Sequence, residues 1–295
     1  MINDIATNIG GLYTAIVTPF DKEQKLRLDY VPAILEFQRK GGVDGVVVCG
    51  TNGEGTSLSV QERKELLEAV MTHRGDLKVI AGTGAANLPE TIELSRHAAA
   101  LEVDATLVLP PFFLKKVADE GLANYFRAVM NAVAIPTLLY NIPQMTAVTI
   151  TDGVLALLKG HPNLAGLKDS TGDWNSTSKF IENYPELQVF CGSDLIAGKA
   201  WVANAAGCIS GSANSFPEFC SDIRDAHRAG KGVEAAQNRL TTAAQILVKY
   251  PFISYSKVVM AHRGLPEMSV RSPLVDMSPE QAKALLGELD FTSLP

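Results

Sequence analysis

The sequence predicts an α/β protein, a (β/α)8 barrel followed by a helical extension at the C-terminus. Eight short apolar runs rich in β-forming residues alternate with longer helical patterns between residues 12 and 209, which is typical of successive βα units around a parallel sheet. A doubly wound open sheet is the alternative, but no G-x-G-x-x-G fingerprint follows the first run. The count of eight favours the barrel. We expect the barrel to occupy residues 1–225 and the extension residues 226–295.

The predicted strands are apolar at nearly every position instead of alternating, as expected for strands buried on both faces. We place them at residues 12–18, 45–49, 78–81, 105–109, 137–140, 164–168, 188–191 and 207–209. In a barrel of this kind, the segments that follow the strands meet at one end and form the active site.

Helical patterns with recognisable ends fill the intervals between the strands. Apolar residues at 28, 31, 34 and 35 form one stripe, and a glycine pair at 41 and 42 ends that helix. Ser59 and Glu62 form a capping box for the second helix, and Asn87 caps the third. Further helices are predicted around residues 120–133, 151–159, 175–184 and 196–204. Beyond the eighth strand, patterns at 217–247 and 257–262 and a helix start at Ser278 indicate the extension.

The composition argues against several classes of partner. The chain has 295 residues, of which 46% are hydrophobic and 20% charged, as in a globular protein with a large core. The formal net charge is -6 and no cluster of lysine and arginine occurs, so we expect no nucleic-acid partner. Since there is no basic amphipathic stretch and no apolar run of bilayer length, we also expect no membrane association.

Cysteine and histidine usage indicates a reducing compartment and no bound metal. The four cysteines show no C-x-x-C spacing, and most lie in or beside apolar runs. Because the N-terminus carries no recognisable secretion signal, we expect a cytoplasmic protein. The five histidines lack metal-ligand spacing, so neither a metal nor another cofactor is predicted.

Three of the segments that follow strands carry side chains suited to one reaction. Lys168 closes the sixth apolar run, where its amine can attack a carbonyl and form a Schiff base; the alternative is a lysine that marks the strand end and extends to solvent. Tyr140 ends the fifth run, and its phenol can transfer protons or simply pack in the barrel. The turn at residues 50–54 includes Thr51 and Asn52, which suit a carboxylate or a phosphate oxygen, although a tight turn needs similar residues. Together these groups suit a 2-oxo acid.

Six short motifs occur in order along most of the chain. They are Thr18-Pro19, Gly50-Thr51-Asn52-Gly53-Glu54, Gly82-Thr83-Gly84, Pro110-Pro111-Phe112-Phe113, Tyr140-Asn141-Ile142-Pro143 and Gly166-Leu167-Lys168-Asp169. This set resembles the dihydrodipicolinate synthase and N-acetylneuraminate lyase family. The resemblance implies a barrel with a helical C-terminal extension, usually a homotetramer, and class I aldolase chemistry through a Schiff base with pyruvate or a pyruvate-derived acid. It also implies that Lys168 forms the Schiff base, that Tyr140 transfers protons, and that Thr51 and Asn52 hold the carboxylate.

Some positions depart from the patterns of the two enzymes that name this family. Dihydrodipicolinate synthases usually carry an arginine at the position of Met145, a tyrosine at Phe113 and a second threonine at Asn52. A thioether cannot replace a guanidinium that pairs with a second carboxylate. Neuraminate lyases typically follow the seventh-strand glycine with two acidic residues, whereas here Asp194 is followed by Leu195. The resemblance is closer to 4-hydroxy-2-oxoglutarate aldolases and to aldolases or dehydratases of 2-keto-3-deoxy sugar acids.

We therefore predict a Schiff-base lyase that cleaves a 2-keto-3-deoxy sugar acid or another 4-hydroxy-2-oxo acid to pyruvate and an aldehyde. The alternatives are a dihydrodipicolinate synthase that joins pyruvate and aspartate semialdehyde, a keto-deoxy acid dehydratase, and a barrel that binds a keto acid without turnover. The predicted substrate-binding residues are Thr51, Asn52, Phe113, Met145, Ser170, Gly192, Asp194 and Ile209.

Overall fold

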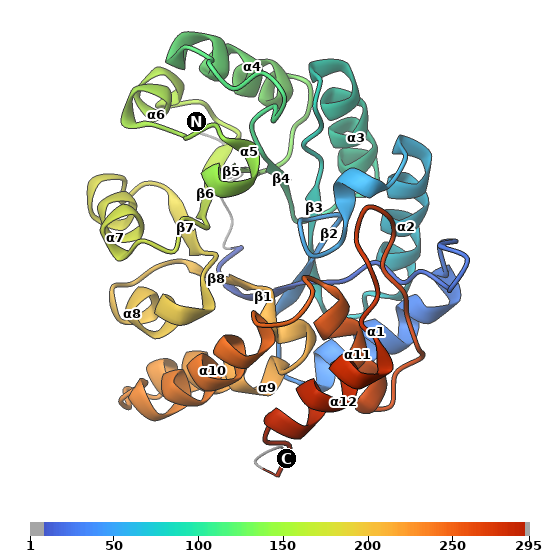
Figure 1. Cartoon of the computed structure of the whole chain (residues 1–295). Helices are drawn as coiled ribbons and strands as arrows, with labels where there is room; N and C mark the ends of the chain where they lie inside the picture. The colour runs from blue at the N-terminus through green and yellow to red at the C-terminus, as the bar shows by residue number, and fades with distance from the viewer. Residues whose placement is uncertain (1–8, 293–295) are drawn as a thin grey trace.

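Eight parallel strands close into a barrel in sequence order (Figure 1). The structure is a computed structural model and describes residues 9–292. Each strand pairs with the next, and the last pairs with the first. The strands are β1 (Gly11–Ala15), β2 (Gly45–Val48), β3 (Lys78–Gly82), β4 (Ala105–Val108), β5 (Thr137–Asn141), β6 (Leu164–Asp169), β7 (Gln188–Cys191) and β8 (Gly207–Ser210). The predicted (β/α)8 barrel is confirmed, and the open sheet is excluded.

The first strand ends earlier than the sequence predicts. Residues 12–18 were expected to be extended, but β1 stops at Ala15. The Asn214 side chain accepts a hydrogen bond from the Val17 amide at 3.0 Å and donates one to the Ala15 carbonyl at 2.7 Å. The Asn214 side chain thus makes backbone hydrogen bonds here that a neighbouring strand would otherwise make. The apolar pattern of the first strand cannot reveal this contact.

Helices surround the barrel (Figure 1). They are α1 (Val31–Lys40), α2 (Val60–His73), α3 (Leu88–Ala100), α4 (Asp119–Asn131), α5 (Pro143–Thr146), α6 (Asp152–Leu158), α7 (Trp174–Asn183), α8 (Ala197–Val202) and α9 (Pro217–Arg228), with 3-10 helices η1 (Leu28–Tyr30), η2 (Gly55–Ser57), η3 (Asp194–Ile196) and η4 (Ser212–Asn214). The predicted caps are confirmed: Ser59 and Glu62 form a reciprocal capping box, and the Asn87 side chain accepts from the Glu90 amide at 2.9 Å. The short helix α5 was not predicted.

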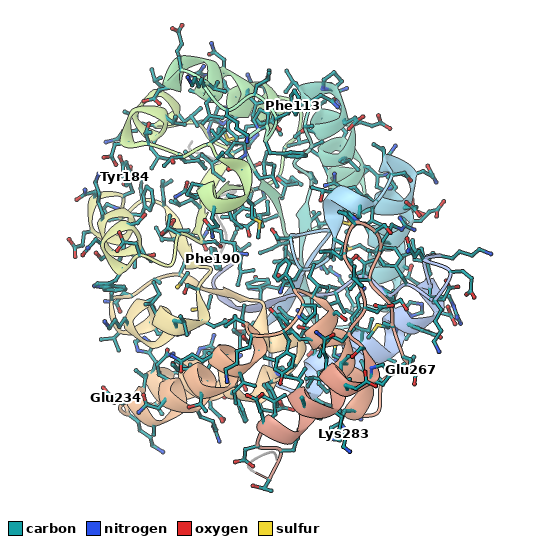
Figure 2. All side chains as sticks on the ribbon, in the orientation of Figure 1. Phe113, Tyr184, Phe190, Glu234, Glu267 and Lys283 are labelled. Carbon is teal, nitrogen blue, oxygen red and sulfur yellow. The ribbon has the colours of Figure 1, made fainter. Side chains whose placement is uncertain are left out.

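Large apolar side chains fill the interior of the barrel. Tyr13 and Phe190 are fully buried and meet edge to face with ring centroids 5.9 Å apart. Figure 2 shows Phe190 near the middle of the molecule. Ile80 and Leu138 belong to the same buried cluster. Because the interior is packed, a ligand must bind at the mouth of the barrel.

The predicted C-terminal extension consists of α10 (Glu234–Leu247), α11 (Ser254–His262) and α12 (Pro279–Glu288). It packs on α9, η3 and η4, and its buried side chains Leu247 and Met260 share one apolar core with the barrel. The helical pattern at residues 217–247 is divided into α9 and α10, and Gly230 adopts a φ of 66° in the break. Helix α9 crosses residue 225, so the division at 225/226 stays a prediction. Within residues 9–292, no helix combines the length and apolar character needed to cross a bilayer.

Candidate active site

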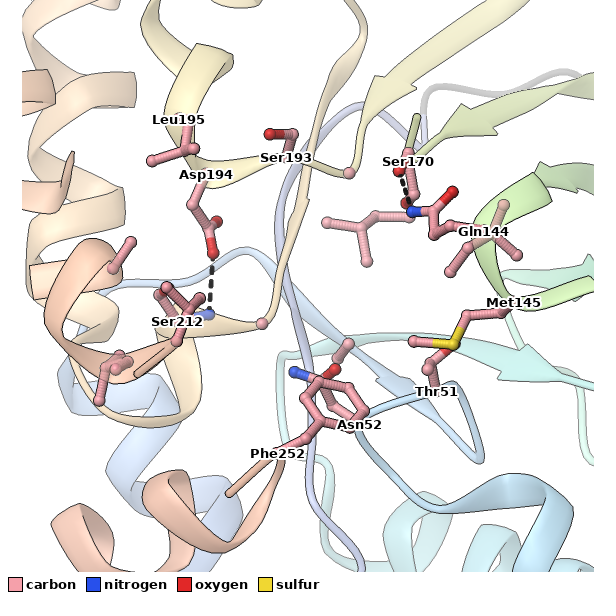
Figure 3. Close-up of a pocket in the computed structure, with 18 of the residues that line it drawn as sticks. Thr51, Asn52, Gln144, Met145, Ser170, Ser193, Asp194, Leu195, Ser212 and Phe252 are labelled. Carbon is pink, nitrogen blue, oxygen red and sulfur yellow. Dashed lines mark hydrogen bonds between the residues drawn. The ribbon is translucent and has the colours of Figure 1, made fainter. Parts of the chain in front are cut away.

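A cavity of about 300 Å³ lies at the end of the barrel where the strands terminate. Figure 3 shows Thr51, Gln144 and Met145 on one side of it and Asp194 and Leu195 on the other. The cavity collects all but one of the predicted site residues: Thr51, Asn52, Tyr140, Met145, Lys168, Ser170, Gly192, Asp194 and Ile209. Its position agrees with the general rule that barrel active sites form at the C-terminal ends of the strands.

Lys168 and Tyr140 share the inner end of this cavity because their strands pair in register. The β5–β6 ladder aligns Tyr140 with Lys168. Lys168 Nζ lies 3.3 Å from Tyr140 Oη and 4.4 Å from the centroid of the tyrosine ring. Lys168 is 5% exposed and Tyr140 is 3% exposed, so bulk water has little access to either group. The arrangement brings an amine and a phenol to one point, as Schiff-base chemistry requires.

The Tyr140 hydroxyl also contacts Thr51, which follows β2. The two hydroxyl oxygens are 3.2 Å apart. Burial is the strongest single influence on the pKa of Tyr140 and opposes ionisation, but the positive charge of Lys168 and contacts with Thr51, Ser170 and Lys168 together outweigh it. The pKa of Tyr140 therefore lies below the ordinary value for tyrosine. A phenol with a lowered pKa gives up its proton more readily, which suits a proton-transfer role.

The outward-facing neighbours of Lys168 and Tyr140 fix the ends of their strands. Asn141 and Asp169 are aligned in the same ladder, and the Asn141 amide donates to the Asp169 carboxylate at 2.8 Å. Asp169 also accepts from the hydroxyls of Thr171 and Thr177 at 2.8 and 2.7 Å. A buried carboxylate with three donors has little freedom to move. The backbone that carries Lys168 is consequently held in place.

The turn that carries Thr51 and Asn52 is tightly packed against the barrel. The Thr18 hydroxyl donates to the Gly53 carbonyl at 2.5 Å. A Cβ at Gly53 would lie 2.9 Å from the Ile16 carbonyl oxygen, so only glycine fits there. The backbone amides of Thr51 and Asn52 donate to no acceptor within residues 9–292. Two unused amides beside a hydroxyl form a suitable site for a carboxylate.

A buried ion pair joins this turn to the C-terminal extension. Lys257 Nζ on α11 lies 2.5 Å from Glu54 Oε1, and both side chains are almost completely buried. Glu54 also accepts from the Arg271 amide at 2.7 Å, and Lys257 donates to the Ser269 carbonyl at 2.6 Å. The sequence predicts no role for Glu54 or Lys257, because no sequence pattern relates two residues so far apart.

Ser170 and Gly192 form the wall next to Lys168. The Ser170 hydroxyl is buried and makes no hydrogen bond of good geometry within the described residues. A Cβ at Gly192 would lie 1.9 Å from the Ser170 hydroxyl oxygen and 2.8 Å from Lys168 Cε. Glycine at this position therefore leaves room for the lysine side chain, and the Ser170 hydroxyl keeps hydrogen-bonding capacity for a polar group of a ligand.

Two of the positions that depart from the family's patterns are Met145 and Phe113. They differ in their position relative to the cavity. Met145 lies on α5 at the rim of the cavity and is 57% exposed. Phe113 is 81% exposed and does not line the cavity; Figure 2 places it at the edge of the molecule near α3 and α4. Its predicted role in substrate binding therefore has no support from its position in this chain.

The C-terminal extension supplies one wall of the cavity that the sequence does not predict. Six lining residues come from α10, from the segment leading into α11 and from α11 itself, namely Ala244, Gln245, Leu247, Val248, Phe252 and Tyr255. The helical pattern predicted the helices but not their position over the barrel mouth. No local signal in these residues distinguishes a cavity wall from an ordinary packed helix face.

Residues 9–292 contain no group of three His, Cys, Asp or Glu side chains arranged to hold a metal ion. Cys49, Cys191, Cys208 and Cys220 are all buried free thiols, and burial raises the pKa of Cys49. Among the described titratable side chains at the inner end of the cavity, Lys168 is therefore the strongest candidate for a nucleophile.

Comparison with known proteins agrees with the geometry. The model of the dihydrodipicolinate synthetase family matches residues 8–290. An uncharacterised DapA-like lyase of Chloroflexus aurantiacus is 41% identical over 93% of this chain and 94% of its own length. A 4-hydroxy-tetrahydrodipicolinate synthase of Phenylobacterium zucineum is 36% identical over 93% of this chain and 94% of its own length.

Two solved structures with the same fold carry information about ligands and catalysis. YagE of Escherichia coli, in complex with pyruvate, has a TM-score of 0.89 and 27% identity over 94% of this chain and 96% of its own. A catalytic lysine mutant of the Ruminococcus gnavus sialic acid aldolase has a TM-score of 0.90 and 27% identity over 95% of this chain and 94% of its own. The chain therefore belongs to the dihydrodipicolinate synthetase family, and it is an enzyme, a lyase of the kind that forms a Schiff base with a lysine.

Proposed function

We propose that the protein reversibly cleaves a 4-hydroxy-2-oxo acid, a class that includes the 2-keto-3-deoxy sugar acids, to pyruvate and an aldehyde. The observation that carries this proposal is the contact of Lys168 Nζ with Tyr140 Oη, and of Tyr140 Oη with Thr51 Oγ1, at the inner end of the cavity. The pyruvate bound to YagE and the aldolase activity named for the Ruminococcus protein support it.

In the proposed reaction, the unprotonated Lys168 amine adds to the C2 ketone and gives a neutral carbinolamine. The Tyr140 phenol donates a proton to the carbinolamine hydroxyl, water leaves, and an iminium ion and the Tyr140 phenolate remain. Tyr140, as phenolate, takes the proton from the C4 hydroxyl while the C3–C4 bond breaks. The electron pair of that bond moves into the iminium, which leaves an enamine of pyruvate and releases the aldehyde. Protonation of C3 by the Tyr140 phenol and hydrolysis of the imine then release pyruvate and restore both residues.

The substrate carboxylate is proposed to bind the amides of Thr51 and Asn52 and the Thr51 hydroxyl. This placement fixes C2 next to Lys168, since a carboxylate and a ketone are adjacent in every 2-oxo acid. Ser170 and Ile209 complete the inner end of the cavity. The same iminium would serve a dehydratase, in which a hydroxyl leaves from C4 of a related sugar acid.

A second candidate is the condensation of pyruvate with aspartate semialdehyde, which the name of the Phenylobacterium relative favours. That substrate brings a second carboxylate. Lys168 is the only cationic side chain among the described residues that line the cavity. With no arginine at Met145, the cavity offers that carboxylate no bidentate partner, so we favour aldol cleavage.

Reductive trapping tests the proposal directly. Incubation with pyruvate and borohydride should convert the iminium to a stable secondary amine on the tryptic peptide that contains Lys168. Lys257, the other buried lysine in the described residues, is an internal control and should stay unmodified. Peptide mass mapping provides the readout, and an unmodified Lys168 at saturating pyruvate would refute the proposed function.

Tyr140→Phe should lower kcat for cleavage by about 10²- to 10⁴-fold, because it removes the group proposed to transfer protons. A coupled assay for released pyruvate measures the effect. Tyr184→Phe is the control, since Tyr184 is a peripheral tyrosine whose hydroxyl bonds Asp152 at 2.9 Å far from the cavity (Figure 2). Equal kcat values for the two variants would remove the role assigned to Tyr140.

On the strength of the family resemblance we also propose a homotetramer that works in the cytoplasm. The four buried free thiols are consistent with a reducing compartment.

A further inference from the structure

The outer part of the cavity is bordered by apolar side chains that face water. Among residues 9–292, nine large hydrophobic side chains are exposed, and four of them, Met145, Leu195, Val248 and Phe252, line this one cavity. They come from α5, from η3 and from the connection between α10 and α11. Single exposed apolar residues need no explanation, but a group from three separate segments around one opening indicates a binding surface.

Apart from Lys168, the described residues that line this cavity include no cation to pair with a negatively charged group. Among the described residues that line the cavity, only Lys168 and Asp194 carry charge. In the proposed reaction, Lys168 forms the iminium ion at C2 and is not available to pair with a carboxylate. Asp194 lies beside Leu195 in the outer part, where its carboxylate would repel a second anion (Figure 3). A substrate with a carboxylate beyond C4 would therefore lose hydration without gaining a counter-charge.

Several polar groups of the wall are already engaged within the protein. The Gln144 amide donates to the Ser170 carbonyl at 2.5 Å, and the Asp194 carboxylate accepts from the Ser212 amide at 3.1 Å (Figure 3). Gln144 and Asp194 therefore have less hydrogen-bonding capacity left for a chain of hydroxyls. Ser193, Ser212 and Gln245 also line the cavity, but the larger part of its lining surface is apolar.

We propose that the substituent on C4 of the substrate is uncharged and apolar, such as an aryl or branched alkyl group, and that the aldehyde product carries it. This inference rests on the proposed function, and it narrows the 4-hydroxy-2-oxo acids to those without a second carboxylate or a polyhydroxylated tail. Met145, Leu195, Val248 and Phe252 are the residues that determine this specificity.

Trapping at Lys168 tests the inference without requiring turnover. Three 2-oxo acids that differ only beyond C3 serve as probes: pyruvate, 2-oxo-4-phenylbutanoate and 2-oxoglutarate. Each is titrated in the presence of borohydride, and the concentration that gives half-maximal modification of Lys168 is measured. We expect the half-maximal concentration of the phenyl acid to lie about 10-fold or more below the half-maximal concentration of pyruvate. The half-maximal concentration of 2-oxoglutarate should lie above the value for pyruvate.

A matched pair of variants locates the effect. Leu195→Ser should raise the half-maximal concentration of the phenyl acid by about 3- to 10-fold and leave that of pyruvate unchanged. Leu157→Ser is the control, because Leu157 on α6 is 47% exposed against 51% for Leu195 but does not line the cavity. An equal effect of both variants would assign the change to the fold and contradict the inference.

Either of two results with these probes overturns the inference while leaving the proposed function intact: tighter binding of 2-oxoglutarate than of pyruvate, or no preference for the phenyl acid over pyruvate. A 2-keto-3-deoxy hexonate that modifies Lys168 at a lower concentration than the phenyl acid would also overturn it. Failure of pyruvate itself to modify Lys168 is a different outcome, since it refutes the proposed function and the inference together.

Discussion

Replacement of Lys168 by methionine should lower kcat for the cleavage of any 2-oxo acid substrate by at least about 10⁴-fold. The variant loses the amine that forms the iminium, and no electron sink remains for the breaking C3–C4 bond. Methionine is similar in length to lysine and apolar, so the small space between Gly192 and Tyr140 stays filled. The measurement is pyruvate release under saturating substrate.

The fold of the Lys168→Met variant should be intact, which separates loss of chemistry from loss of structure. Lys168 is 5% exposed, and an apolar side chain avoids the cost of burying an ammonium group. We therefore expect a melting temperature no lower than that of the parent protein. Lys179→Met, at a lysine that is 52% exposed, controls for the loss of a positive charge and should keep full activity. Substantial turnover by Lys168→Met would place the nucleophile elsewhere.

The inner end of the cavity could be predicted from the sequence because each of its residues ends a strand. Lys168 and Tyr140 terminate apolar runs, and a barrel brings the ends of neighbouring strands together. The register that aligns the two residues depends on a shift in the β5–β6 ladder between Thr137 and Leu138, and the apolar pattern of the strands does not predict that shift. Strand periodicity and barrel geometry were thus sufficient to bring the amine and the phenol to the same ends of neighbouring strands, but not to align them.

The outer end could not be predicted in the same way. Phe252 and Val248 reach the cavity from the C-terminal extension, whose position over the barrel depends on packing among helices that share no local pattern with the strands. Phe113 shows the converse: it lies in a loop after β4 and was placed in the site by resemblance, yet its side chain is exposed and does not line the cavity. Loop conformation depends on few contacts, so the position of a loop residue in the sequence predicts its direction poorly.

The Glu54–Lys257 ion pair connects the turn at the inner end of the cavity to the C-terminal extension. Its disruption is expected to have the second large effect, a loss of stability. Lys257→Met should reduce the free energy of unfolding by about 3–5 kcal/mol, because it leaves the Glu54 carboxylate buried without its cation. Chemical denaturation followed by circular dichroism measures the change. Lys22→Met is the matched control: the Lys22–Glu267 pair is more than four-fifths exposed, and its loss should change stability by less than about 1 kcal/mol.

The double variant Glu54→Gln/Lys257→Met distinguishes an unpaired charge from lost packing. With both charges removed, no buried ion is left uncompensated, so the double variant should be more stable than Lys257→Met alone. If the double variant is no more stable, then packing of the Lys257 stem, and not the charge of Glu54, accounts for the loss.

Glu54 follows the Thr51–Asn52 turn directly and adopts a φ of 50°, a left-handed conformation that its contacts with Lys257 and Arg271 maintain. Any variant that releases Glu54 should therefore also raise the pyruvate concentration needed to modify Lys168, since the turn proposed to hold the carboxylate loses its anchor.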